Sequence, residues 1–328
     1  MFADLHIHML LSGADWKAAI AGHQPEPDDI LIRNRLSAYK NADISYLRDG
    51  GDRFGVCLRA RELAPEYGIT YRTPAFPIYK KSHYGSFVGR GWSDFAEYRA
   101  LLAEAKAAGA DFIKLMVSGL MDFSVYGRLT EEPLTGEEMH DLIAAAHDIG
   151  YAVMAHCNGA EAVKNAVLSG VDSIEHGAYL DDDACHILAE SRAVWVPTLS
   201  TIGNLIGSGR FPDEVAERIL RSAQENIRKV ANLGLLVWAA TRVRSGYPMW
   251  RAPSARRNGC ARPWARTPTT SCPPQKDRSG QNSDFYWYIK GLYRYIKGRY
   301  RYNKTPGFFS PSVSAYAETP PSSEEGLI

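Results

Sequence analysis

The sequence predicts an α/β fold, a (β/α)8 TIM-barrel-like architecture that is incomplete at its eighth strand. Three observations predict it. Short apolar segments alternate with helical segments over about the first 237 residues. The apolar segments are near-continuous runs, which is typical of parallel strands buried on both faces. Counting them gives seven complete strands and the start of an eighth. A doubly wound open sheet is the alternative closure.

The first half of the chain begins with an expected strand at 4–8, which carries His6 and His8. Further strands are expected at 43–48 and 69–75, helices at 29–42, 53–67 and 94–108, and a long Pro/Gly/Tyr/Ser-rich loop at 76–92. In the first of these helices, we expect the following positions to face inward: Ile30, Ile32, Leu36 and Tyr39.

The second half continues the alternation. Strands are expected at 111–117, 151–156, 171–176 and 193–198, with the start of the eighth at 235–237. Helices are expected up to Ile149 and at 160–168, 181–191 and 212–232. Thr135 and Glu138 have the spacing of a capping box, which predicts that the helix ending at Ile149 begins there.

Bulk composition narrows the function classes. The chain has 328 residues, 45% of them hydrophobic and 23% charged, and a net charge of +1. This balance argues against a nucleic-acid or membrane partner. The five cysteines are scattered, without disulfide or zinc-ribbon spacing, which indicates a reducing setting. We find no signal peptide and no membrane-spanning apolar run, and therefore expect a cytoplasmic location.

Polar residues at strand ends are the candidate functional residues, because barrels place their active sites there. His6 and His8 share one face of the first strand and form half of a metal site. For an isolated His-x-His pair, the simpler interpretation is two histidines near a chain end. His156 and His176 each end an apolar strand. Lys114 lies inside an apolar strand, where burying an ammonium costs several kcal/mol. A pKa lowered by burial would let its amine take up carbon dioxide as a carbamate, whose two oxygens can bridge two metal ions.

Four segments resemble the metal-dependent amidohydrolase superfamily, in its imidazolonepropionase and prolidase-like branch. They are DLHIH at 4–8, IKLM at 113–116, MAH at 154–156 and SIEHG at 173–177. They stand in the family's order, at the ends of strands one, four, five and six. The resemblance covers about residues 1–237.

The resemblance implies a site with one or two divalent ions, for which we expect zinc. His6 and His8 would bind one ion, His156 and His176 the other, and a carbamylated Lys114 would bridge them. The implied activity is hydrolysis of an amide or cyclic amide C–N bond by a metal-bound hydroxide. The implied partner is a small-molecule substrate that is dipeptide-like or imidazolone-like.

The family's strand-eight aspartate, which binds metal and acts as general base, is absent, so the catalytic base is unknown. No Asp or Glu occurs between Glu225 and Asp277. Read from the third base of the Trp238 codon, the DNA behind residues 238–244 can encode the family's Gly-Ser-Asp-Ala-Gly turn. Residues 238–266 contain seven arginines, three tryptophans and no acidic residue. We therefore interpret residues 1–237 as the barrel domain and 238–328 as a frame-shifted or disordered tail.

Three consequences stay open at this point. Loss of the aspartate predicts impaired hydrolysis, and the alternative is a catalytically dead metal-binding barrel remnant. A second alternative is single-stranded nucleic-acid binding by the aromatic and basic residues at 285–304, which we do not favour because no binding fold surrounds them. An unpaired edge beside the missing strand would invite pairing with another copy, so we expect a homo-oligomer as one outcome.

Overall fold

The computed structural model describes residues 2–12, 15–233, 243–244 and 247–248, all of which belong to one compact unit. Its strands are β1 (Phe2–Ile7), β2 (Ile44–Asp49), β3 (Thr70–Arg72), β4 (Pro77–Lys80), β5 (Arg90–Trp92), β6 (Ile113–Met116), β7 (Val153–Cys157), β8 (Ser173–His176), β9 (Val194–Val196), β10 (Val243–Arg244) and β11 (Tyr247–Pro248). Its α-helices are α1 (Trp16–Ala21), α2 (Asp29–Asn41), α3 (Val56–Leu63), α4 (Phe95–Ala107), α5 (Gly136–Asp148), α6 (Ala160–Leu168), α7 (Asp182–Glu190), α8 (Leu199–Gly203) and α9 (Asp213–Asn232), and a 3-10 turn spans Ala64–Tyr67.

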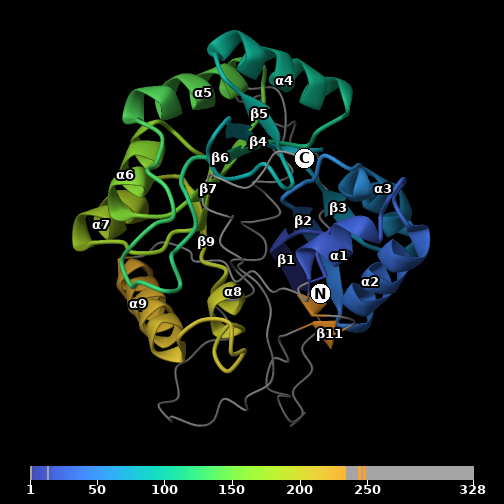
Figure 1. Ribbon diagram of the computed structural model, residues 1–328. Coiled ribbons are helices and arrows are strands. Elements are labelled where there is room, and N and C mark those ends of the chain that lie inside the picture. The colour runs from blue at the N-terminus through green and yellow to red at the C-terminus, as the bar shows by residue number, and fades with distance from the viewer. Residues whose placement is uncertain (1, 13–14, 234–242, 245–246, 249–328) are drawn as a thin grey trace, which may run out of the picture. The chain divides into compact units, whose positions relative to one another are not determined.

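The strands pair in the order expected of a barrel wall. One sheet has the order β1-β2-β3 and the other β5-β4-β6-β7-β8-β9, and every described pair within them is parallel. A doubly wound sheet reverses its strand order at a switch point. The order from β6 to β9 runs without such a reversal, which favours the barrel over the open alternative (Figure 1).

The segment 76–92, expected as a loop, contains β4 and β5, so that expectation was wrong. Its turn-forming residues suggested a loop, but backbone hydrogen bonds to β6 hold β4 in a strand, with Ile78 opposite Leu115.

The chain passes from the first sheet to the second between β3 and β4. Ala75 adopts a φ of 66° at this passage, and Asp111 N donates to Thr73 O at 2.8 Å. The predicted strand at 69–75 is therefore interrupted.

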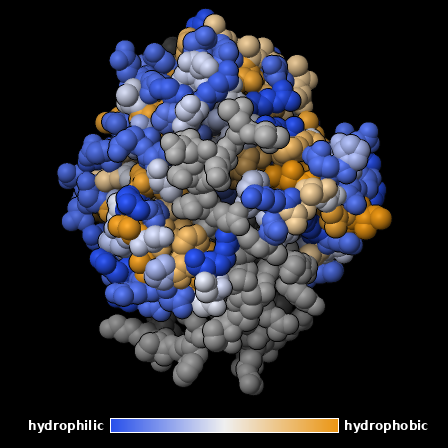
Figure 2. Space-filling view, in the orientation of Figure 1, coloured by the Kyte–Doolittle hydropathy of each residue, from blue (hydrophilic) through white to orange (hydrophobic). Residues whose placement is uncertain are grey.

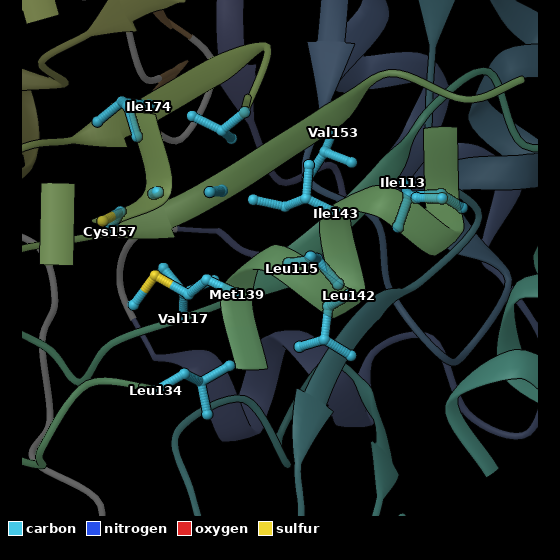
Figure 3. Close-up of a cluster of buried hydrophobic side chains, with 14 of the residues drawn as sticks. Ile113, Leu115, Val117, Leu134, Met139, Leu142, Ile143, Val153, Cys157 and Ile174 are labelled. Carbon is cyan, nitrogen blue, oxygen red and sulfur yellow. The ribbon is translucent and has the colours of Figure 1, made fainter. Parts of the chain in front are cut away.

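An apolar core lies between the second sheet and the helices that cover it. Figure 3 shows Ile113 and Leu115 of β6 beside Leu142 and Ile143 of α5. The cluster extends along β7 and β8 to side chains of α4, α6 and α7. Truncating a buried leucine such as Leu142 to alanine costs about 2–5 kcal/mol. The opposite faces of the helices are mainly hydrophilic (Figure 2). The helices therefore pack their apolar faces against the strands that carry the site.

Local signals explain most helix boundaries. Thr135 accepts from Glu138 N at 3.2 Å and Thr135 N donates to the Glu138 carboxylate at 3.0 Å, which confirms the capping box. In α2 the expectation for Ile30 was wrong, because its side chain is 70% exposed. The buried positions Ile32, Leu36 and Tyr39 follow i, i+4, i+7 spacing, and Ile30 lies about 200° from Ile32 around the helix.

Several expectations fall outside the described residues. These are the start of an eighth strand at 235–237, the tail that begins at 238, and the aromatic and basic segment at 285–304. The domain boundary at 237 therefore stays a prediction. Among the helices that the structure describes, none combines the length and apolar character needed to cross a membrane.

Candidate metal centre

Alternation along the parallel strands sorts their side chains into two faces. Leu115 and Ile174 belong to the apolar core beneath the helices. Lys114, His156 and Glu175 occupy the alternate positions, and the register places His156 opposite Glu175 on the neighbouring strand. Because all three are buried yet lie outside the apolar core cluster, these positions form the polar interior of the strands.

His176 departs from this alternation. It follows Glu175 directly, so a regular strand would direct its side chain to the opposite face. Its backbone instead adopts a φ of 70°, and the ring lies 4.6 Å from the His156 ring and 4.8 Å from the His6 ring, centroid to centroid. The next residue must be small, because a Cβ on Gly177 would lie 2.4 Å from Trp195 Nε1. One strand thus supplies two consecutive residues to the site.

His6 and His8 lie together at the end of β1, as predicted, with ring centroids 5.6 Å apart. The His8 ring packs against Gly50, where an added Cβ would lie 2.5 Å from His8 Cε1. A larger residue at position 50 would displace the ring. The four predicted histidines are therefore brought together from β1, β7 and β8, that is, from both sheets.

Hydrogen bonds to acceptor oxygens indicate which ring nitrogen carries the hydrogen on His6 and His8. His6 Nδ1 donates to Glu175 Oε2 at 2.6 Å, and His8 Nδ1 donates to Gly51 O at 3.3 Å. His156 Nε2 lies 3.1 Å from Gly119 O. Carbonyl and carboxylate oxygens only accept, so on His6 and His8 the bonded Nδ1 carries the hydrogen and Nε2 is the unprotonated nitrogen. His156 Nε2 also lies 3.3 Å from the Asn158 amide nitrogen, a donor, so it faces both an acceptor and a donor. On His176, Nδ1 lies 2.6 Å from the Thr198 hydroxyl.

Lys114 is buried, with 1% of its surface exposed. Among the described residues, no atom forms a hydrogen bond with its Nζ. Burial lowers the pKa of this amine to about 7; the positive charge of Arg48 adds to the effect, while Glu175 opposes it. A large share of these lysines is therefore uncharged near neutral pH, as the sequence predicts for a lysine inside an apolar strand.

Burial and repulsion from neighbouring groups lower the pKa of three of the four histidines, which favours their neutral form. Burial lowers the pKa of His6 well below its usual value, with a further contribution from the charge of Lys114. The same two causes lower the pKa of His156 to about 3. For His176 the lowering comes from burial first and then from His156. Neutral imidazole is the form that binds metal ions.

The donor set fits a divalent metal: four histidines, three of them with a pKa lowered by burial, and one buried amine that lacks a hydrogen-bond partner among the described residues. Within the described ranges, the side chains as they stand form no group of three or more His, Cys, Asp or Glu ready to hold an ion. The rings pack on one another, and an ion would have to separate them.

Sequence reasoning missed two residues at the centre of this site. Glu175 belongs to the SIEHG segment and contacts His6, and Arg48 of β2 contacts Glu175. A signal existed, since each is a charged residue within a strand that is otherwise largely buried. The structure also places the ring of Tyr84, from the segment expected as a loop, 4.9 Å from the His156 ring.

Comparison with known proteins identifies the family. The family model described as "Amidohydrolase family" matches residues 59–255, more than half of the chain. The chain belongs to the amidohydrolase family. The matched segment contains Lys114, His156 and His176 but not His6 and His8, and it extends past residue 237, where we expect the barrel domain to end.

Several solved structures share the fold. The A. niger ochratoxinase aligns with a TM-score of 0.62 at 18% identity, over 74% of this chain and 63% of that chain. A Xaa-Pro dipeptidase with bound methionine aligns with a TM-score of 0.56 at 21% identity, over 73% and 64%. These likenesses, together with the family match, confirm the parallel TIM-barrel class that the sequence predicts. The incompleteness predicted at strand eight concerns residues outside the described ranges.

A curated relative is an uncharacterized protein of Mycobacterium tuberculosis. It is 32% identical over 128 residues, which is 38% of this chain and 34% of that protein. The chain thus matches about a third of the length of its curated relatives.

Proposed function

We propose that this protein binds divalent metal ions through four histidines and Lys114, and that this site hydrolyses amide C–N bonds in small molecules. One observation carries the proposal. The described ends of parallel strands bring together His6, His8, His156 and His176 around an interior that also contains a buried amine without a hydrogen-bond partner. Family membership supports the reaction class.

The proposed assignment of ligands follows the strands. His6 and His8 hold one ion, and His156 and His176 hold the other, with zinc as the expected metal. Lys114 would supply two oxygens to the ions as a carbamate. For this, the uncharged Nζ attacks the carbon of carbon dioxide, an N–C bond forms as one C=O π bond breaks, the electron pair of that bond goes to oxygen, and one proton passes from the nitrogen to water. When bound, the metal supplies Lewis acidity that polarises a carbonyl and activates water.

The substrate class is a proposal from the relatives' names alone. The solved relatives include a Xaa-Pro dipeptidase, a phenylurea hydrolase and an ochratoxinase. The first two names denote substrates in which a C–N bond joins a carbonyl to nitrogen. We therefore propose small amides, with dipeptides as the first choice.

Turnover should be slow. The sequence has no acidic residue between Glu225 and Asp277, so the strand-eight aspartate that the resemblance implies is missing. Without that residue the site lacks one ligand and a general base for the attacking water. A positioned general base is typically worth 10²–10⁴-fold in rate, and this is the deficit that we expect.

Metal analysis and an activity screen test the proposal together. The purified full chain, loaded with zinc and bicarbonate, should retain one or two zinc ions per chain after desalting, and the double variant H156N/H176N should retain fewer. A screen of Xaa-Pro and other dipeptides should give weak, chelator-sensitive hydrolysis. If the wild type retains no metal, the assigned site is wrong. Fast turnover by the chain as written would contradict the predicted impairment.

A further inference from the structure

Arg48 connects three strands inside the fold. Its side chain is only 2% exposed. Nε donates to Leu5 O at 2.7 Å, Nη1 donates to Ser173 Oγ at 3.0 Å, and Nη2 donates to Glu175 Oε1 at 2.6 Å. Leu5 lies on β1 and the other two partners lie on β8. One guanidinium from β2 therefore links the three-stranded sheet to the six-stranded sheet.

The two carboxylate oxygens of Glu175 contact different residues. Oε1 faces Arg48 and also accepts from the Ser173 hydroxyl. Oε2 accepts from His6 Nδ1. The side chain has no exposed surface. A buried carboxylate is stable only when its charge is compensated and its lone pairs are occupied, and these three partners meet that requirement.

We propose that Glu175 is a positioning residue that fixes the tautomer and orientation of the His6 ring, and that Arg48 holds Glu175 in place for this task. The carboxylate accepts the Nδ1 hydrogen, which leaves the Nε2 lone pair available to an ion. Neither residue is among the proposed ligands. The role of this arrangement in metal binding rests on the proposed function, whereas the contacts among His6, Glu175 and Arg48 do not.

Arg48 determines which atom of residue 175 faces His6. A guanidinium has five N–H donors and no acceptor, so whatever atom faces Nη2 has to accept. With glutamate at position 175, the second oxygen is also an acceptor and takes the hydrogen from His6. With glutamine there, the amide oxygen stays with Arg48 and the NH2 group turns toward His6. His6 then has to accept at Nδ1, and its hydrogen moves to Nε2.

Replacing Glu175 with glutamine should therefore invert the tautomer of His6 with almost no change in side-chain volume. The nitrogen left for a metal ion would then be protonated. Loss of a partner that orients a metal-binding histidine typically lowers metal affinity 10–100-fold. We expect a loss of this size for E175Q.

A matched control is available in Asp122. Its carboxylate is also buried and also faces an arginine, with Arg128 Nε at 2.6 Å. It contacts none of the four histidine rings. The variant D122N makes the same carboxylate-to-amide change in a buried aspartate whose arginine partner is exposed, and should leave both the His6 tautomer and the zinc affinity at their wild-type values.

The test uses the full-length chain and two measurements. Long-range ¹H–¹⁵N correlation spectra of the metal-free protein report the tautomer of each histidine, and titration with zinc against a competing chelator reports affinity. The wild type should show His6 protonated at Nδ1, E175Q at Nε2, and E175Q should bind zinc 10–100-fold more weakly. A purely structural role for Glu175 would change stability without inverting the tautomer.

The wild-type spectrum alone keeps the inference testable if E175Q does not fold. A wild-type His6 that is protonated at Nε2, or that exchanges rapidly between tautomers, would overturn it. So would an E175Q variant that binds zinc within twofold of the wild type. Failure of the proposed function is recognised separately, because in that case the wild type itself does not bind zinc while its tautomer can still be read.

Discussion

Replacing Lys114 with methionine should stabilise the metal-free protein. The folded chain holds this amine at a pKa of about 7, compared with 10.5 for an ordinary lysine. The unfolded chain therefore binds a proton below about pH 10.5, whereas the folded chain binds it only below about pH 7. The native lysine thus lowers stability progressively as the pH falls from 10.5 to 7, and the full loss remains below pH 7.

The magnitude follows from the two pKa values. Since one pKa unit corresponds to about 1.4 kcal/mol, the burial of Lys114 costs about 4 kcal/mol at pH 7, where half of the folded chains still bind the proton. Methionine has a similar length and no charge, so K114M should recover most of this amount. At pH 9 the gain should shrink to about 2 kcal/mol, because fewer unfolded chains carry the proton.

Urea unfolding of both proteins measures the gain, in buffers freed of metal and carbon dioxide so that neither ligand stabilises the wild type. Lys80 supplies the control, because its amine is half-buried and lies 2.5 Å from the Glu138 carboxylate. K80M should be slightly destabilising at every pH. The reasoning is refuted if K114M is no more stable than the wild type at pH 7, or if its gain stays constant from pH 7 to pH 9.

Three further predictions concern other features of the fold. G50A should lower zinc affinity roughly tenfold, because its Cβ would lie 2.5 Å from His8 Cε1. Chelator competition measures this affinity. G203A, where the nearest atom lies 3.9 Å from the added Cβ, should leave zinc affinity unchanged. His23 has a pKa of about 4 in the fold against 6.5 ordinarily, mainly through burial, so wild-type stability should fall as the pH drops from 6.5 to 4. H23Q should lose less stability than the wild type between pH 7 and pH 5, measured by urea unfolding. An equal loss in the two proteins would contradict this. T135A should lower stability by about 1 kcal/mol through the lost cap, with unchanged zinc affinity as its control.

Much of the fold was predictable because local signals determine it. Near-continuous apolar runs marked the parallel strands, and the capping box at Thr135 marked the start of α5. The strands β4 and β5 were missed, because β4 pairs with the edge of β6 and β5 with β4, and this pairing does not depend on their own composition. Ile30 was misplaced because it was grouped with positions on the opposite face of α2.

The site was predictable where residue type and strand position suffice. The four histidines and Lys114 follow from strand ends and from an amine in an apolar run. The turn at His176 was not predictable, since it depends on a φ of 70° that alternation does not encode. Nor was the contact between Arg48 and Glu175, which are 127 positions apart in the sequence. Such a pairing is determined by the closure of the fold and not by any local pattern.

The contact between His6 and Glu175, which joins residues 169 positions apart, also sets the order in which the site can form. During synthesis β1 leaves the ribosome first, and β8 follows only after about three quarters of the described chain has been made. At typical elongation rates of about 5–20 residues per second, β1 waits roughly 10–30 s for this partner. Loop-closure entropy further disfavours so distant a contact until the intervening units have packed. Metal uptake should therefore be a late event, and a chain stalled before β8 should bind zinc no better than a free His-x-His peptide.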